Sequence, residues 1–195
     1  MKKIYILAIL AAGGATVVQA QQGQAQQGGN QTNMGNEDKA AIQLSLTPDI
    51  ALYPRTTTID GFSLNIWGEN QQQGATFGLI NGSVGQSGGF SCGVVNYDDA
   101  YTGIQWGVVN VSNEEFVGWQ SGVVNTSQGT FSGFQDGLVN LSEEANGCQL
   151  GLVNYTQRLR GLQIGVINVA ANNNGWFDEF PDKLAPVFPI VNWSF

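Results

Sequence analysis

A four-residue motif, glycine followed by two hydrophobic residues and asparagine, recurs through the middle of the chain at intervals of 14 or 15 residues. Its glycines are Gly78, Gly93, Gly107, Gly122, Gly137, Gly151 and Gly165. A near-constant period with similar residues in each copy indicates one supersecondary unit that is repeated along the chain, each copy burying its surface against its neighbours. The repeat therefore predicts an architecture, and it does not by itself indicate a chemistry.

The repeat has the pattern of β-strands. Residues alternate with period two, as in the run from Gly103 to Asn110, and the runs are rich in β-branched and aromatic residues. Segments of six or seven turn-forming residues separate them. Eight strands are predicted to begin at Gly61, Gly74, Gly89, Gly103, Gly118, Gly133, Gly147 and Gly161. The runs 187–195 and 42–46 are candidates for a ninth and a tenth strand.

The two faces of these strands differ. One face repeats glycine and a polar residue almost without change, and the polar positions are Thr76, Ser91, Gln105, Gln120, Gln135, Gln149 and Gln163. The other face is apolar and varies in size from Ala75 to Trp106. Close packing holds side-chain size constant. The repetitive face is therefore predicted to be the packed interior, and the apolar face is predicted to point outward.

Two all-β architectures of 14–15-residue units fit this pattern. We favour an antiparallel up-and-down β-barrel of about 8–10 strands, with the apolar face toward lipid and the glutamines filling the lumen. The alternative is a parallel β-solenoid, in which the glutamine amides would face solvent and the motif asparagines would stack into a ladder: Asn81, Asn96, Asn110, Asn125, Asn140, Asn154 and Asn168.

Chain geometry limits the solenoid. An unbroken eight-residue strand covers about 26 Å, and six or seven turn residues reach at most roughly 20 to 25 Å, which is too little to return and start a parallel coil. The solenoid requires each strand to bend at its central glycine. Adjacent apolar pairs such as Val108-Val109 permit such a corner.

The C-terminal run favours the barrel. Val187, Val191, Trp193 and Phe195 share one face of the predicted last strand. This pattern resembles the terminal strand of bacterial outer-membrane barrels, which implies outer-membrane lipid and the barrel-insertion machinery as partners. Pro189 departs from the pattern, because proline cannot donate to a ladder and belongs at an edge or a bulge.

The repeats and the closing run Phe188–Phe195 are similar to a family of bacterial surface-repeat proteins with Gly-x-Gln-x-Gly-hydrophobic-hydrophobic-Asn repeats, over roughly residues 58–195. The resemblance implies a secreted or envelope location, and it supplies no catalytic residue.

The N-terminus predicts export. Lys2 and Lys3 precede an apolar run that ends at Ala20, which is the pattern of a signal peptide over residues 1–20. Residues 21–40 are rich in Gln, Gly and Asn and are predicted to be disordered, and 41–195 is predicted to be a single β-repeat domain. The expected location is the outer membrane or cell surface of a Gram-negative bacterium. Without Lys2 and Lys3, five basic residues face fifteen acidic ones, which argues against nucleic acid as a partner.

Few residues suggest a chemistry. The chain has no histidine, the commonest general base and metal ligand, so we expect no enzyme, catalytic site, cofactor or metal site. Cys92 and Cys148 lie on the apolar face and are interpreted as small hydrophobic residues rather than a disulfide. The acidic pairs fall in turns, where solvated charge is the simplest interpretation and a weak Ca²⁺ site the alternative: Asp98-Asp99, Glu114-Glu115 and Glu143-Glu144.

Two further sets of residues are open to more than one interpretation. The tryptophans indicate either an interfacial girdle or a carbohydrate-stacking surface: Trp67, Trp106, Trp119, Trp176 and Trp193. Formal N-glycosylation sites occur at Asn30, Asn81, Asn110, Asn125, Asn140, Asn154 and Asn192. Because five of these asparagines end a strand of the repeat, turn capping explains them more simply.

The sequence as a whole predicts a non-enzymatic envelope protein, a small outer-membrane barrel with a structural or adhesive role. The alternatives are a secreted β-solenoid that binds surface glycans or proteins along a repetitive face, and a pore for small solutes.

Overall fold

The computed structural model describes residues 38–195, and every regular element in this range is a β-strand. The strands are β1 (Lys39–Thr47), β2 (Ile50–Ala51), β3 (Thr58–Asn70), β4 (Gln73–Cys92), β5 (Val95–Trp106), β6 (Val109–Ser112), β7 (Glu115–Ala170) and β8 (Val187–Ser194). The predicted signal peptide and most of the segment 21–40 lie outside the described residues. The predicted domain start at residue 41 falls inside β1.

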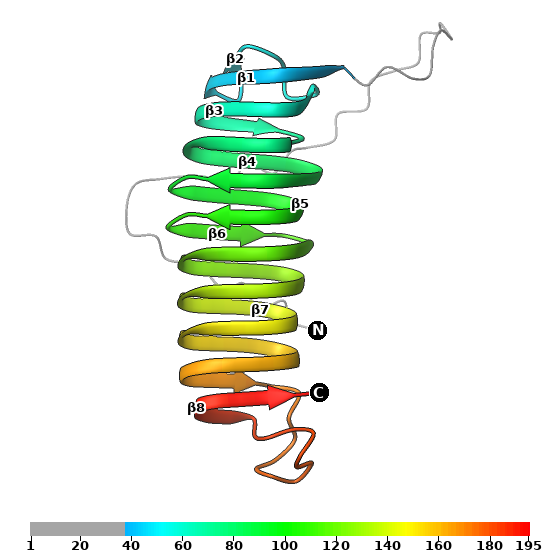
Figure 1. The fold of residues 1–195 in the computed structure, drawn as a ribbon, viewed down its shortest axis with the longest axis vertical. Helices are drawn as coiled ribbons and strands as arrows, with labels where there is room; N and C mark the ends of the chain where they lie inside the picture. The colour runs from blue at the N-terminus through cyan, green and yellow to red at the C-terminus, as the bar shows by residue number, and fades with distance from the viewer. Residues whose placement is uncertain (1–37) are drawn as a thin grey trace, which may run out of the picture. The chain divides into compact units, whose positions relative to one another are not determined.

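Neighbouring coils of the chain are parallel from β1 to β7. Phe62 pairs with Ala75 and Val95 pairs with Val109, so each coil lies directly below the residues one repeat earlier in the chain in the view of Figure 1. Figure 1 shows the resulting column, which winds as a β-solenoid. The antiparallel barrel prediction is therefore wrong, and the alternative prediction of a parallel β-solenoid is confirmed.

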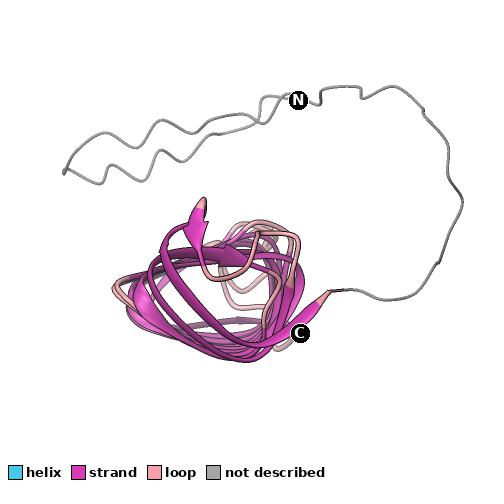
Figure 2. Cartoon of the chain, turned by 90° about the horizontal axis from the view of Figure 1, so that it is seen from above, coloured by secondary structure: helices cyan, strands magenta, loops and turns pink. Residues whose placement is uncertain are grey.

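Corners at the motif glycines make this path possible. The strands are interrupted at Gly107 and Val108, between β5 and β6, and again at Asn113 and Glu114, between β6 and β7. A coil seen along its axis therefore has short flat sides rather than one long strand (Figure 2). The barrel prediction treated Gly103 to Asn110 as one unbroken strand, and the corner at the central glycine is what overturns it.

A second set of glycines brings successive coils close together. Gly118 has φ of +136°, and a Cβ on it would overlap the carbonyl oxygen of Gly103 in the coil above. Only glycine adopts this conformation without a steric penalty. Residues equivalent to Gly118 recur once per coil with positive φ: Gly61, Gly74, Gly89, Gly103, Gly133, Gly147 and Gly161.

One ladder of asparagine amides runs through the interior, as the solenoid alternative predicted. The Nδ2 of Asn125 donates to Oδ1 of Asn140 at 2.8 Å and to the carbonyl oxygen of Asp136 at 2.9 Å, so each amide links two coils. The same side-chain bond joins every consecutive pair in the set Asn81, Asn96, Asn110, Asn125, Asn140, Asn154 and Asn168.

Glutamines form a second buried ladder. Gln135 donates through Nε2 to Oε1 of Gln120 at 2.8 Å, and its own Oε1 accepts from Gln149 at 2.8 Å and from the hydroxyl of Ser142 at 3.1 Å. The prediction that the Gly/Gln face is interior is confirmed, since its five glutamines are fully buried: Gln105, Gln120, Gln135, Gln149 and Gln163. The expectation that glutamines of a solenoid face solvent is wrong, because the corners turn this face inward.

The apolar part of the interior is small. Tyr101, Phe116 and Phe131 stack with ring centroids 5.9 Å apart, and Ala145, Leu159 and Ala170 complete the cluster. The rest of the interior is polar: glutamine, asparagine, serine and threonine side chains outnumber the apolar ones among the buried residues. Buried polar groups are tolerated only when they are hydrogen-bonded, so the ladders are a condition of the fold.

Short antiparallel segments close both ends of the solenoid. At the N-terminal end β2 pairs antiparallel with β1, and the side chain of Gln43 bonds both the backbone nitrogen and the carbonyl oxygen of Tyr53. At the C-terminal end β8 pairs antiparallel with the last coil of β7, and Lys183 forms a bridge to Ser194 on the far edge of β8. Both ends are thus covered by antiparallel chain.

The C-terminal run forms the predicted strand but not the predicted structure. β8 covers most of 187–195, and Val191 and Trp193 pair with Ile164 and Leu162 of the last coil. It is therefore an end cap of the solenoid and not the closing strand of a barrel. Pro189 lies at the register shift of this pairing, as expected of a proline at a bulge.

Candidate binding surface

One side of the solenoid exposes apolar side chains along the whole column. The side that contains Ile104, Trp106 and Val108 presents three outward positions in each coil. We call these three columns the apolar face. The first column is Ile42, Phe62, Ala75, Phe90, Ile104, Trp119, Phe134, Cys148, Leu162 and Trp193. The second is Leu44, Leu64, Phe77, Cys92, Trp106, Ser121, Asp136, Leu150, Ile164 and Val191. The third is Leu46, Ile66, Leu79, Val94, Val108, Val123, Leu138, Leu152 and Val166.

This face is exposed, as the sequence predicted for its variable residues. Trp106 is 45% exposed, Leu138 51% and Val166 62%. Ten levels of strand, nine from β1 to β7 and one from β8, are spaced by about 4.8 Å and give the face a length of about 43 Å, and five residues of strand give it a width of about 13 Å. Its projected area is therefore roughly 550 Å². This is the size of the largest apolar patch on a typical soluble protein, and such a patch is often functional.

Aromatic rings follow one another across the face. Phe90 contacts Trp106 with ring centroids 5.8 Å apart, and Trp106 contacts Trp119 at 5.8 Å. The series continues through Phe62 and Phe77 on one side and Phe134 on the other. The planes of Trp106 and Trp119 are inclined by 89°, so these rings contact edge to face. The row is continuous but it is not a coplanar platform.

The one charged side chain of the apolar face accepts hydrogen bonds from its neighbours on that face. Asp136 accepts from the indole nitrogen of Trp119 through Oδ1 and from the hydroxyl of Ser121 through Oδ2 at 3.0 Å. Because both oxygens already have donors within the face, covering Asp136 with a partner costs less than covering a bare carboxylate.

The charged residues lie on another side of the coil. Two glutamate pairs lie at the second corner and are directed outward, Glu114-Glu115 and Glu143-Glu144. Arg158 bridges to Glu143 at 3.4 Å and to Glu144. The interpretation of these glutamates as solvated charge agrees with their exposure. Among residues 38–195 no group of three acidic, cysteine or histidine side chains could hold a metal ion.

Asp98 differs from the other acidic residues, because it points inward and is fully buried. Its Oδ2 accepts from Nε2 of Gln105 at 2.6 Å and from the hydroxyl of Ser112 at 3.0 Å, whereas Oδ1 has no partner. Burial raises the pKa of Asp98 to about 7. The interpretation of Asp98 as a solvated turn residue is therefore wrong. Its place in the repeat, two residues after the motif asparagine, is that of the buried Ser112.

Asp98 ends the glutamine ladder. Gln105 is the first glutamine of the ladder, and the equivalent position one coil earlier is Ser91, whose short side chain turns to Asn96 instead. Asp98 supplies the acceptor that Gln105 would otherwise lack. The buried carboxylate therefore marks the boundary between a region with small polar residues and the regular ladder.

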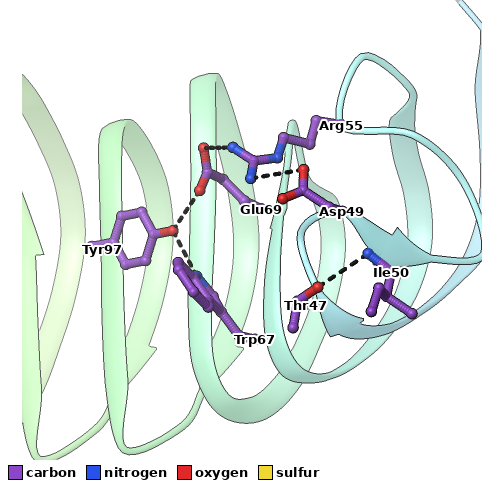
Figure 3. A network of polar contacts seen from close by, with 7 residues as sticks. All are labelled: Thr47, Asp49, Ile50, Arg55, Trp67, Glu69 and Tyr97. Carbon is purple, nitrogen blue, oxygen red and sulfur yellow. Dashed lines mark hydrogen bonds and ion pairs between the residues drawn. The ribbon is translucent and has the colours of Figure 1, made fainter. Parts of the chain in front are cut away.

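A polar network fixes the N-terminal cap to the coils (Figure 3). Arg55 bridges to Asp49 at 3.2 Å and to Glu69 at 3.4 Å. The hydroxyl of Tyr97 donates to Glu69 at 2.8 Å and accepts from the indole nitrogen of Trp67 at 3.1 Å. Burial raises the pKa of the Tyr97 phenol, so it stays protonated and able to donate.

Each end of the apolar face has its own shape. At the N-terminal end a groove of about 660 Å³ is lined by residues of β1, β2 and β3, among them Leu44, Ile50 and Leu64. At the C-terminal end Phe180 packs against Trp193 with centroids 6.3 Å apart, and Phe180 is 60% exposed. One end is hollow and the other carries an exposed aromatic cluster. Nothing in the repeat motif predicts either feature, because both lie in the caps.

The structure separates the predicted residues into different places. Trp106 and Trp119 lie in contact on the apolar face, Trp193 ends the first column of that face, and Trp176 lies outside the columns at the C-terminal end. Cys92 and Cys148 are unpaired and partly exposed on the apolar face.

The asparagines with N-glycosylation patterns point into the interior rather than into turns. Asn81, Asn110, Asn125, Asn140, Asn154 and Asn192 are buried, so neither glycan attachment nor turn capping describes them. Asn30 lies outside the described residues.

Within residues 38–195 no helix long and apolar enough to cross a membrane is present. No protein-family model, curated protein or solved structure matches this chain. The resemblance to bacterial surface-repeat proteins therefore stays a prediction.

Proposed function

We propose that this chain is an exported, non-enzymatic protein of the bacterial envelope that binds a macromolecular partner through its apolar face. The observation that carries the proposal is a distribution of side chains opposite to the usual one, with polar groups inside and apolar groups outside. Polar amides fill the interior, while leucine, valine, phenylalanine and tryptophan cover one flat outer side. A solenoid gains no folding energy from apolar residues left in water, and their concentration on one side indicates a surface that is covered in use.

The pattern of signal-peptide residues at the N-terminus supports export. The absence of histidine and the engagement of the buried amides in ladders support a role without catalysis. Extended repeat surfaces commonly serve as binding scaffolds, which agrees with the structural or adhesive role expected from the sequence.

The chemistry of the face favours an apolar protein surface over a glycan. Sugar rings stack on exposed aromatic faces, but Phe90, Trp106 and Trp119 present edges to one another at 71° and 89°. The third column is aliphatic throughout and offers no hydrogen-bonding side chain. A polysaccharide would leave its hydroxyl groups without partners against such a surface.

Site-specific photo-cross-linking in a bacterium that expresses the full chain tests this proposal. A benzophenone amino acid replaces Val108 on the apolar face, or Gln128 on the charged side as the matched control, because both positions are exposed. We expect ultraviolet light to give cross-linked products at position 108 and few or none at position 128. Equal yields at the two positions would contradict the assignment of the binding surface, and recovery of the chain only from the cytosol would contradict export.

A further inference from the structure

We infer that the partner of the apolar face is a second copy of this chain, packed face to face about a two-fold axis perpendicular to the solenoid. The inference rests on the proposed function, since it names the occupant of that same surface. It makes the working unit a homodimer with its charged sides directed outward.

The size of the face agrees with this occupant. Its projected area of roughly 550 Å², before the relief of the side chains is counted, approaches the lower end of what each partner buries in a stable complex, about 600 Å². A flat strip of about 43 Å is matched along its whole length by another strip of the same length. A second copy therefore covers the face completely.

The distribution of charge favours contact between two copies through the apolar face over contact through the charged side. The chain carries a formal net charge of −8, so two copies repel each other at long range. The glutamate pairs Glu114-Glu115 and Glu143-Glu144 lie on another side of the coil. On the apolar face the single carboxylate, Asp136, already accepts two hydrogen bonds. Approach through the apolar face thus keeps the like charges away from the contact.

The central pair of the second column is self-complementary. Its ten positions run from Leu44 to Val191, and the midpoint falls between Trp106 and Ser121. A two-fold axis at this midpoint places Trp106 of one copy over the smaller Ser121 of the other. An isologous interface requires this reciprocity, in which one residue contacts another and the reverse contact follows by symmetry.

The same axis brings the two ends of the face together. The groove beside Leu44, Ile50 and Leu64 lies at the N-terminal end, and the exposed Phe180 and Trp193 lie at the C-terminal end. Rotation about a perpendicular two-fold axis lays the aromatic end of one copy over the hollow end of the other. A two-fold axis parallel to the solenoid would instead set groove against groove.

Light scattering coupled to size-exclusion chromatography tests the stoichiometry on the purified full chain at 1 to 100 µM. We expect a mass twice that of the single chain, as measured by mass spectrometry on the same sample. Val108→Glu with Leu138→Glu should return the mass to that of one chain, because both exposed positions then carry like charges across the contact. The control Gln128→Glu on the charged side should leave the dimer intact. A wild type with the mass of one chain at 100 µM would overturn the inference.

Cross-linking with a short bis-maleimide tests the axis. In a background of Cys92→Ser and Cys148→Ser, Ser121→Cys should link to its counterpart, since both lie beside the axis on sheets about 10 Å apart. Phe62→Cys should not, because its counterpart is about seven coil spacings, or about 34 Å, away along the face. Linking at Phe62→Cys, with or without linking at Ser121→Cys, would overturn the central perpendicular axis.

The photo-cross-linked products formed in cells at position 108 distinguish this inference from the proposed function. A product with twice the mass of the chain, containing only its peptides, supports the homodimer. A product with a different protein, or flotation of the single chain with phosphatidylethanolamine vesicles, overturns the homodimer and leaves the apolar face as the binding surface. No product above that of the control at position 128 contradicts both.

Discussion

Asp98→Asn should stabilise the folded protein at neutral pH and leave it unchanged at acidic pH. The reason is the raised pKa of the buried carboxyl group, about 7 in the fold against 3.8 for the free side chain. Below pH 3.8 both the folded and the unfolded chain hold this proton, and Asp98 makes no pH-dependent contribution. Between pH 3.8 and 7 the unfolded chain releases the proton while the folded chain retains it, so the free energy of unfolding falls by about 1.4 kcal/mol per pH unit.

The accumulated loss from this group is about 4 kcal/mol by pH 7 and is constant above it. Asparagine has the same shape, its oxygen accepts from Gln105 as the carboxylate does, and it cannot ionise. Urea denaturation at pH 4 and pH 8 measures the free energy of unfolding of both proteins. We expect near-equal values at pH 4 and a gain of a few kcal/mol for Asp98→Asn at pH 8.

The control is Glu115→Gln, which removes an exposed charge from the charged side of the coil and should show no such difference between the two pH values. A lower stability of Asp98→Asn at pH 8, or an equal change at both pH values, would refute the argument. Either result would mean that the charge of Asp98 is compensated in the fold and that its burial does not govern its ionisation.

Three other substitutions test the ladders and the cap. Gln135→Leu should lower the free energy of unfolding by about 2–5 kcal/mol in urea, because Nε2 of Gln149 and Oε1 of Gln120 each lose a buried hydrogen bond and keep only a serine hydroxyl partner. Gln128→Leu on the exposed side should change it little. Gly118→Ala should destabilise by more than 1 kcal/mol, or about 2–4 °C or more in thermal unfolding, since its Cβ would overlap a backbone oxygen, and Gly85→Ala, which meets open space, should cost less. Tyr97→Phe should cost about 1 kcal/mol through the loss of two hydrogen bonds, measured by calorimetry, and no change would mean that the network does not hold the cap.

The period-two alternation of the repeat was enough to predict which side chains point into the interior and which point outward. The constancy of Gln105 and its equivalents against the variation at Trp106 and its equivalents correctly separated interior from exterior. Both architectures share this alternation, so it did not distinguish parallel from antiparallel pairing. That choice depends on the corner at Gly107, where the chain bends, and a period-two pattern continues through a bend unchanged.

Other features were predictable only in part. The burial of Asp98 follows from aligning it with Ser112, two residues after the motif asparagine, but an aspartate in a turn-rich segment is more often solvated. The groove and the aromatic end cluster arise from cap residues such as Ile50 and Phe180, which belong to no repeat. A cap residue has no equivalent in another repeat of the same sequence, so comparison of the repeats could not predict its place.

The antiparallel end caps have a consequence for growth of the structure. Stacked parallel coils with in-register asparagine and glutamine side chains share their hydrogen-bonding geometry with amyloid fibrils, in which each added chain templates the next. β2 on β1, and residue Lys183 on β8, occupy edges that would otherwise accept another chain. The caps therefore limit the number of stacked coils, which the repeat itself does not set. Loss of either cap would leave an open strand edge on which further chains could polymerise.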